Sequence, residues 1–219
     1  MRFSIYILLL TIFIGLSSAS IAQNTDQKLA TQYYQNGQYE QAILYFEKLY
    51  RENPSDYFYT YYFKSLVNLE RYPEAEKLAR KQIKKVKGNV KYYVDLGHMY
   101  HKTEQAEKGK KLYEKAIKDV PAKQQSIRQL AKAFSSIGEN EYALQAYLRG
   151  RKTVKNGNFN IAIAELYGSM GRQAEMVNEY LNLLNVNDMY IQQVQNALAR
   201  TIDFKEKTPE TNQLKGELL

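Results

Sequence analysis

The sequence predicts an all-α fold in which pairs of helices repeat along the chain. Two distant segments share one pattern of apolar, small and aromatic residues at helical spacing. Glycine falls at the break between several of the expected helices, and proline ends two of the repeated units. The chain has no cysteine, so we expect packing alone, without disulfides, to hold the fold together.

The repeat is clearest in KLATQYYQNGQYEQAILYFEKLYRENP at 28–54 and YVDLGHMYHKTEQAEKGKKLYEKAIKDVP at 93–121. In each segment, a first helical stretch has a small residue followed three positions later by an aromatic residue. A second stretch has a small residue, then an aromatic residue four positions later, and ends at proline. Small residues let neighbouring helices approach closely, and the rings fill the space beside them.

The same columns continue along most of the chain. The small residues of the first helices are Ala30, Gly97, Ala131 and Ala164, and those of the second helices are Ala42, Ala75, Gly109 and Ala143. This pattern resembles the tetratricopeptide repeat, a helix–turn–helix unit of about 34 residues. The resemblance implies an all-α, right-handed superhelical solenoid. We interpret residues 23–188 as five units, beginning near Gln23, Asp56, Val90, Gln124 and Gly157.

The second unit departs from the columns at two positions. Phe63 stands where a small residue is expected, and Ala79 stands where a large ring is expected. Such an exchange would keep the total side-chain volume, and cores tolerate changes that conserve volume. A one-residue shift in the alignment of this unit is the alternative.

The two ends of the chain differ from the repeats. The segment MRFSIYILLLTIFIGLSSASIAQ has one basic residue, an apolar run, and then Ser20 and Ala22 at the spacing that signal peptidase reads. We predict a signal peptide at 1–22, with an uncleaved anchor as the alternative. We therefore expect an exported bacterial protein, periplasmic or secreted, and not a lipoprotein. Residues 189–219 are interpreted as a degenerate or truncated sixth unit, with a helix start at Thr208–Pro209.

The stretch DYFYTYYF at 56–63 is dense in aromatic residues. Helical spacing puts Tyr57 and Tyr61 on one face, and Lys64 and Asn68 continue it toward the concave groove that the resemblance implies. We expect Tyr59, Tyr62 and Phe63 to pack against adjacent helices. Together with Tyr34, the first face is predicted to bind a peptide, because tyrosine gives a large contact area and a hydroxyl group. The alternative is that all these rings serve the core.

The other predicted partner-binding residues are basic or histidine side chains of the first helices. They are Lys91, His98, His101, Lys102, Arg128 and Lys132. A basic, tyrosine-lined groove favours an acidic protein or peptide ligand. The formal net charge of +8 would also suit nucleic acid, but the predicted export argues against that partner.

No catalytic or metal site is predicted. With two histidines, no cysteine and no glycine-rich phosphate loop, the usual catalytic constellations cannot be assembled, and we predict no cofactor. Asp95, His98 and His101 are three residues apart, and this spacing turns Asp95 and His101 away from each other. The leading hypothesis is a non-catalytic protein-interaction scaffold of the bacterial cell envelope.

Two further functions remain open. The segment KLARKQIKKVKGNVK at 77–91 has basic but no acidic residues. Its helix is expected on the convex face, where it would be either an ordinary solvated surface or a contact with anionic glycan, peptidoglycan or lipid head groups. The relevant side chains there are Lys81, Lys84 and Lys85. The chain could also be the adaptor half of a longer protein.

Overall fold

The computed structural model describes residues 24–201, and every regular element in this range is helical. The predicted all-α fold class is therefore confirmed. The predicted leader at 1–22 and the helix start at Thr208–Pro209 lie outside the described residues. None of the described helices is long and apolar enough to cross a membrane. The chain divides into two compact units, with unit 1 ending at Lys85 and unit 2 beginning at Val86.

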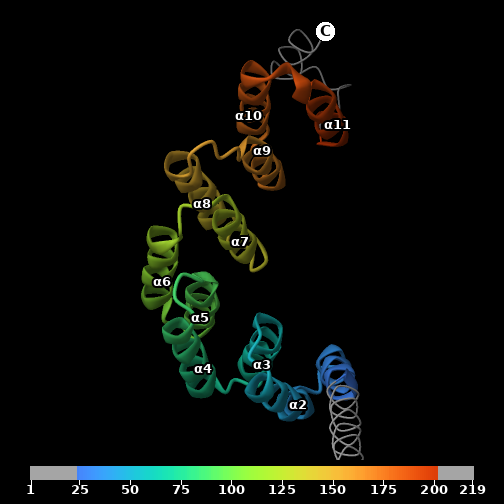
Figure 1. Ribbon diagram of the computed structural model, residues 1–219, viewed down its shortest axis with the longest axis vertical. Helices are drawn as coiled ribbons and strands as arrows, with labels where there is room; N and C mark the ends of the chain where they lie inside the picture. Colours follow the sequence, from blue (N-terminus) through green and yellow to red (C-terminus); the bar gives the residue numbers. More distant parts are fainter. Residues whose placement is uncertain (1–23, 202–219) are drawn as a thin grey trace, which may run out of the picture. The chain divides into compact units, whose positions relative to one another are not determined.

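Unit 1 contains two helix pairs (Figure 1). A helix over residues 24–35 precedes α2 (Tyr39–Glu52), and α3 (Asp56–Asn68) precedes α4 (Tyr72–Lys85). The start of α3 is capped by Ser55, whose side chain accepts a hydrogen bond from the Phe58 amide at 3.3 Å. This cap sets the position of the aromatic stretch on α3.

Unit 2 continues the pattern of helix pairs and then adds a single helix (Figure 1). The pairs are α5 (Lys91–Lys102) with α6 (Ala106–Asp119), α7 (Gln124–Ser135) with α8 (Asn140–Thr153), and α9 (Asn160–Ser169) with α10 (Gln173–Val186). A short 3₁₀ helix, η1 (Asp188–Tyr190), leads into α11 (Ile191–Thr201). Val194 and Leu198 of α11 are fully buried against the end of this unit.

The turn inside each helix pair has one residue with a left-handed backbone. Glycine fills this position in three turns, at Gly37, Gly138 and Gly171, with φ of 73°, 81° and 73°. Glu70 and Glu104 fill it in the other two turns, each with φ 58°. The next residue donates its amide to a carbonyl near the end of the preceding helix, as Gln38 does to Tyr33 at 2.9 Å. Each first helix thus ends in the same kind of C-terminal motif.

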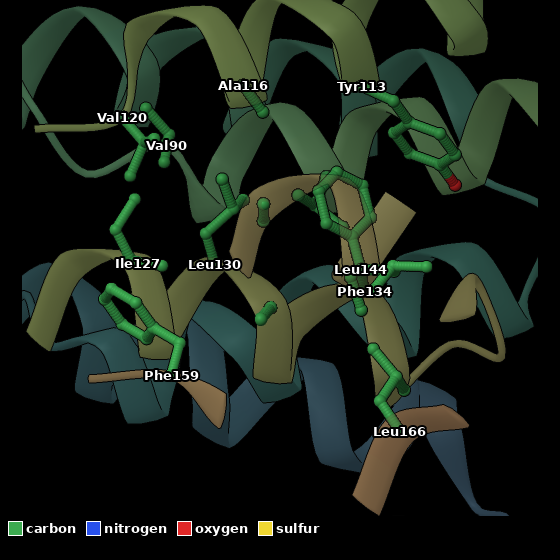
Figure 2. Packing of buried hydrophobic residues seen from close by; sticks show 14 of the residues in the cluster. Val90, Tyr113, Ala116, Val120, Ile127, Leu130, Phe134, Leu144, Phe159 and Leu166 are labelled. Atoms are coloured by element: carbon green, nitrogen blue, oxygen red, sulfur yellow. The ribbon is translucent and has the colours of Figure 1, made fainter. Parts of the chain in front are cut away.

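The core of unit 2 runs through successive repeats instead of gathering at one centre (Figure 2). Tyr113 on α6, Phe134 on α7 and Leu144 on α8 belong to one buried cluster, which extends to Leu166 on α9. Each helix pair therefore buries its apolar surface against the next pair, as expected for stacked repeats.

The small residues that define the repeat all lie at buried helix contacts. Ala30, Ala42, Ala75, Ala131, Ala143 and Ala164 are each 0% exposed. The departures in the second unit are buried as well, because Phe63 is 6% and Ala79 is 0% exposed. Phe63 stacks on Tyr59 with ring centroids 5.8 Å apart.

The approach of α5 and α6 is especially close, because both small positions are glycine. A Cβ atom on Gly97 would lie 2.5 Å from a ring carbon of Tyr113. A Cβ atom on Gly109 would lie 2.7 Å from the carbonyl oxygen of Gly97 and 2.4 Å from the ring of His101. The two helix backbones leave no space for a methyl group at either position.

The Tyr113 hydroxyl group is buried and has no hydrogen-bond partner within the described part of the chain. Burial, with smaller contributions from Glu139, Tyr142 and Asp95, raises the pKa of Tyr113, so the group stays neutral. We expect Tyr113→Phe to increase the free energy of unfolding by about 1 kcal/mol, because an unsatisfied buried hydroxyl group is removed while the ring is kept. Urea unfolding followed by far-UV circular dichroism measures this change. A loss of stability would mean that the hydroxyl group has a partner.

Candidate partner-binding site

Three of the predicted tyrosines meet in unit 1. The ring of Tyr34, from the helix at 24–35, lies edge-on to Tyr61 of α3 with centroids 4.9 Å apart. Tyr57 lies 4.8 Å from Tyr61, and Tyr61 stacks on Phe46 of α2 at 5.2 Å and 14°. We call Tyr34, Phe46, Tyr57 and Tyr61 the aromatic cluster. Three helices contribute to it, so the rings are held by the packing of the unit.

The cluster runs from the core to the surface. Phe46 is completely buried, Tyr34 and Tyr61 are partly buried, and Tyr57 is 39% exposed. An exposed aromatic ring supported by buried rings loses little conformational freedom when a partner covers it. Tyr57 is therefore the side chain of the cluster that is best placed to contact a partner.

Hydrogen bonds hold two of the tyrosine hydroxyl groups. Thr31 Oγ1 donates to the carbonyl of Gln27 at 2.8 Å and lies 3.1 Å from the Tyr57 hydroxyl group. Because the single Thr31 proton is already used, Tyr57 is the donor in this contact. Burial, followed by Tyr39 and Tyr61, raises the pKa of Tyr34, and a hydrogen bond from Asn68 opposes this rise. The Tyr34 hydroxyl group is therefore neutral at physiological pH.

The surface beside the cluster is polar and mostly uncharged. A hollow of about 350 Å³ on the helix at 24–35 is lined by Gln27, Thr31, Gln35 and neighbouring residues, and Lys28 is the only charged residue among its described lining residues. These amides were not among the predicted partner-binding residues. Their four-residue spacing, Gln27–Thr31–Gln35, is the sequence signal that would have placed them on one helix face. Lys64, close to Tyr61 on α3, is exposed.

Lys91, His98 and Lys102 lie on α5 in unit 2. Lys91 forms an ion pair with Asp95 at 2.5 Å, so its charge is partly compensated within its own helix. His98 is partly buried, and Lys102 is exposed near the end of the helix.

His101 is partly buried at the contact between α5 and α6. Its ring stacks on Tyr113 at 5.1 Å and 19°, and its carbon atoms face Gly109 of α6. Its Nε2 atom is buried and has no hydrogen-bond partner among the described residues. The paired glycines bring α6 so close to α5 that the two helices partly enclose the ring.

Arg128 and Lys132 are four residues apart on α7, and both are exposed. They line a hollow of about 510 Å³ together with three glutamines of the same helix. The Arg128 guanidinium donates to the carbonyl of Asn158 at 3.1 Å and lies 5.6 Å from the centroid of Phe159. Arg128 is therefore held in place, while Lys132 stays exposed beside it.

The predicted partner-binding residues thus fall into two groups. The three tyrosines, Lys64 and Asn68 belong to unit 1, and the histidines and remaining basic residues belong to unit 2. Across the described range, no group of three or more histidine or acidic side chains is placed to hold a metal ion.

Comparison with known proteins identifies the repeat. A family model for the tetratricopeptide repeat matches residues 27–56 and 90–118. No curated protein matches the chain.

Solved structures give further similarities. One is TTC0263, a thermophilic tetratricopeptide repeat protein of Thermus thermophilus, which is 22% identical. The match covers 82% of this chain and 98% of the TTC0263 chain, with a TM-score of 0.41. Another is MamA from Desulfovibrio magneticus RS-1, which is 14% identical. The match covers 76% of this chain and 96% of the MamA chain, with a TM-score of 0.40. A further MamA structure is 16% identical. The match covers 78% of this chain and 94% of the MamA chain, with a TM-score of 0.38.

The matched segments coincide with the places where the sequence pattern is clearest. Residues 27–56 cover most of the first helix pair, and residues 90–118 cover α5 and nearly all of α6. Proteins of this fold generally serve as scaffolds for protein–protein interaction. The described residues therefore form an all-α solenoid of helix pairs, and two segments of it match the tetratricopeptide repeat.

Proposed function

We propose that this protein is a non-catalytic scaffold that binds a segment of a partner protein on the aromatic cluster of unit 1. The exposed ring of Tyr57, supported by Tyr61 and Phe46, is the observation that carries this proposal. Buried aromatic anchors dominate the energetics of many interfaces, and tyrosine is among the most common of them. Covering Tyr57 would bury apolar surface without displacing any part of the unit.

The surroundings of the cluster favour a peptide as the ligand. The amides of Gln27 and Gln35 can donate and accept hydrogen bonds, as the backbone of an extended peptide requires. Exposed Lys28 and Lys64 favour an acidic residue in the ligand. We infer a ligand segment with an apolar or aromatic side chain and nearby carboxylate groups.

The cell envelope is the proposed location. The basis is the sequence of residues 1–22, which has the basic start, apolar run and small residues of a leader that is removed on export. A partner would then be a periplasmic, secreted or membrane protein with a segment that reaches this compartment.

An in-cell cross-link tests the proposed function. A photoreactive amino acid replaces the exposed Lys64, close to Tyr61 on α3, and captured proteins are identified by mass spectrometry. We expect one defined envelope protein to be captured, and Tyr57→Ala to reduce its yield about tenfold because the central anchor is lost. The mass of the captured chain also shows whether residues 1–22 have been removed.

Tyr45→Ala is the matched control for Tyr57→Ala. Tyr45 is a partly buried ring in the same unit, but it stacks on Tyr33 at 5.7 Å and belongs to a different surface. Capture should survive this substitution. If Tyr57→Ala leaves the yield unchanged while the protein stays folded, the aromatic cluster is not the partner-binding site.

A further inference from the structure

Unit 1 has a second concave surface, which the proposed function does not use. A cleft of about 480 Å³ is lined by residues of α2 and α4, together with Tyr62 of α3. Its lining includes Tyr50 and Pro54 from the region of α2, Tyr62, and Leu78 from α4. We call this surface the α2–α4 cleft. None of its lining residues belongs to the aromatic cluster.

The floor of the cleft is apolar and firmly packed. Tyr50 is 7% and Leu78 is 8% exposed, and the rings of Tyr50 and Tyr62 lie 6.3 Å apart. The Tyr50 hydroxyl group donates to Gln82 Oε1 at 2.5 Å, which ties α2 to α4 beneath the cleft. The floor is therefore preformed, and it can receive an apolar side chain without rearrangement.

A row of basic side chains lines the cleft along α4. Lys77, Lys81 and Lys85 follow one another at intervals of four residues, which correspond to about 6 Å along a helix. Arg51, in the last turn of α2, contributes a further positive charge to the lining. Positive charge thus comes from two of the helices that form the cleft.

Three cations of the cleft differ from two arginines nearby, which are already paired. Arg80 pairs with Glu76 at 2.7 Å, and Arg71 pairs with Glu74 at 2.6 Å. By contrast, Arg51, Lys81 and Lys85 form no ion pair with any residue in the described range. The cleft therefore carries uncompensated positive charge, and exposed Lys84, outside the cleft, adds to the positive charge of α4.

The acidic residues of the cleft are already engaged. Glu74 is held by two hydrogen bonds from the Arg71 guanidinium, and this contact lowers the pKa of the Glu74 carboxyl group. Burial raises the pKa of Tyr62 to about 12, with Glu47 and Glu74 adding to the rise, and Tyr62 hydrogen-bonds to Glu47. Glu47 is therefore an acidic side chain in a cleft whose other charged residues are mainly basic.

This combination favours one class of ligand. A polymer with uniform negative charge would meet Glu47 and would gain nothing from the apolar floor. A peptide can place an apolar side chain on Tyr50 and Leu78 and direct carboxylate groups toward Lys81 and Lys85. We propose that the α2–α4 cleft is a second protein-binding site, which takes an acidic segment with an apolar anchor. One unit would then hold two protein segments at separate sites.

A peptide-display selection tests this inference with the full chain. A library of random twelve-residue peptides is selected on the immobilised protein, and binders to the Lys81→Glu/Lys85→Glu variant are removed. We expect the enriched peptides to carry two or more acidic residues and one large apolar residue. Titration calorimetry then measures the affinity of a selected synthetic peptide for each variant.

Two controls separate the cleft from general charge and from the first site. Lys110→Glu/Lys111→Glu makes the same change in net charge on exposed positions of α6. Tyr57→Ala alters the aromatic cluster alone. We expect Lys81→Glu/Lys85→Glu to weaken binding of the peptide at least tenfold, because two close charge contacts become repulsive. Both control variants should bind within about twofold of the original protein.

Several results would overturn the assignment of the α2–α4 cleft as a second protein-binding site. Enriched peptides without an acidic surplus, or with equal affinity for Lys81→Glu/Lys85→Glu, would overturn the proposal. A heparin dodecasaccharide that binds through the same lysines, when no peptide does, would assign the cleft to an anionic polymer. Circular dichroism and thermal unfolding of each variant establish that the helices remain intact. Loss of peptide binding in Tyr57→Ala would place the peptide on the aromatic cluster and reject the second site.

Discussion

Gly109→Ala is expected to lower the free energy of unfolding of unit 2 by about 2 kcal/mol. Replacing glycine by alanine inside a helix normally stabilises it by about 1 kcal/mol, so the expected sign is reversed. The added methyl group would lie 2.7 Å from the carbonyl oxygen of Gly97, and a backbone atom cannot move aside alone. The helices α5 and α6 would have to separate, and the contacts of Tyr113 and His101 would be loosened.

Urea unfolding, followed by far-UV circular dichroism, measures this loss. Lys110→Ala, at the next position of α6 and exposed, is the control, and it should change stability by no more than about 0.5 kcal/mol. Gly97→Ala should also destabilise, because its methyl group meets the ring of Tyr113. If Gly109→Ala were neutral or stabilising, α5 and α6 would not approach as closely as described.

Phe46→Ala is expected to have the largest effect in unit 1, a loss of about 3–5 kcal/mol in the free energy of unfolding. Phe46 is 0% exposed and stacks directly on Tyr61. Its removal would leave a cavity beneath the aromatic cluster. The rings of Tyr61 and Tyr57 would lose their support, so capture of a partner at Lys64 should fall as well.

Two further variants identify the cause of this loss. Phe46→Leu fills most of the space and should cost less than Phe46→Ala, while restoring part of the partner capture. Leu44→Ala, on the same helix and 69% exposed, should be close to neutral. Thermal unfolding and cross-linking yield are measured on the same samples of each variant. Equal stability losses for Phe46→Ala and Leu44→Ala would contradict a buried supporting role for Phe46.

The repeat itself could be predicted because close helix packing restricts residue size. The alanines of the small columns are buried, and they recur at one period along the chain. The turns were only partly predictable. Glycine indicates a left-handed position at Gly37, Gly138 and Gly171, but Glu70 and Glu104 adopt it without that signal. In these two turns, the capping hydrogen bonds and the packing of the pair override the local preference of the residue.

The aromatic cluster could be predicted because it depends on helical spacing and on the contact between successive helices. Tyr57 and Tyr61 are one turn apart, and the repeat places the helix of Tyr34 beside them. The enclosure of His101 depends on how closely α6 approaches α5 and could not be obtained from spacing on α5 alone. Arg51 and Lys81 are far apart in the sequence, so only the packing of α2 near α4 reveals that they share a cleft.

The packed rings of unit 1 also give the protein an optical signature. The chain has 20 tyrosines and no tryptophan, so tyrosine dominates its ultraviolet absorption and its fluorescence. Rings held in fixed asymmetric surroundings produce near-ultraviolet circular dichroism, which disappears when packing is lost. A ligand that covers Tyr57 would change the spectrum of rings already coupled through Tyr61. Binding to this surface can therefore be followed on the unlabelled protein, without a tryptophan background.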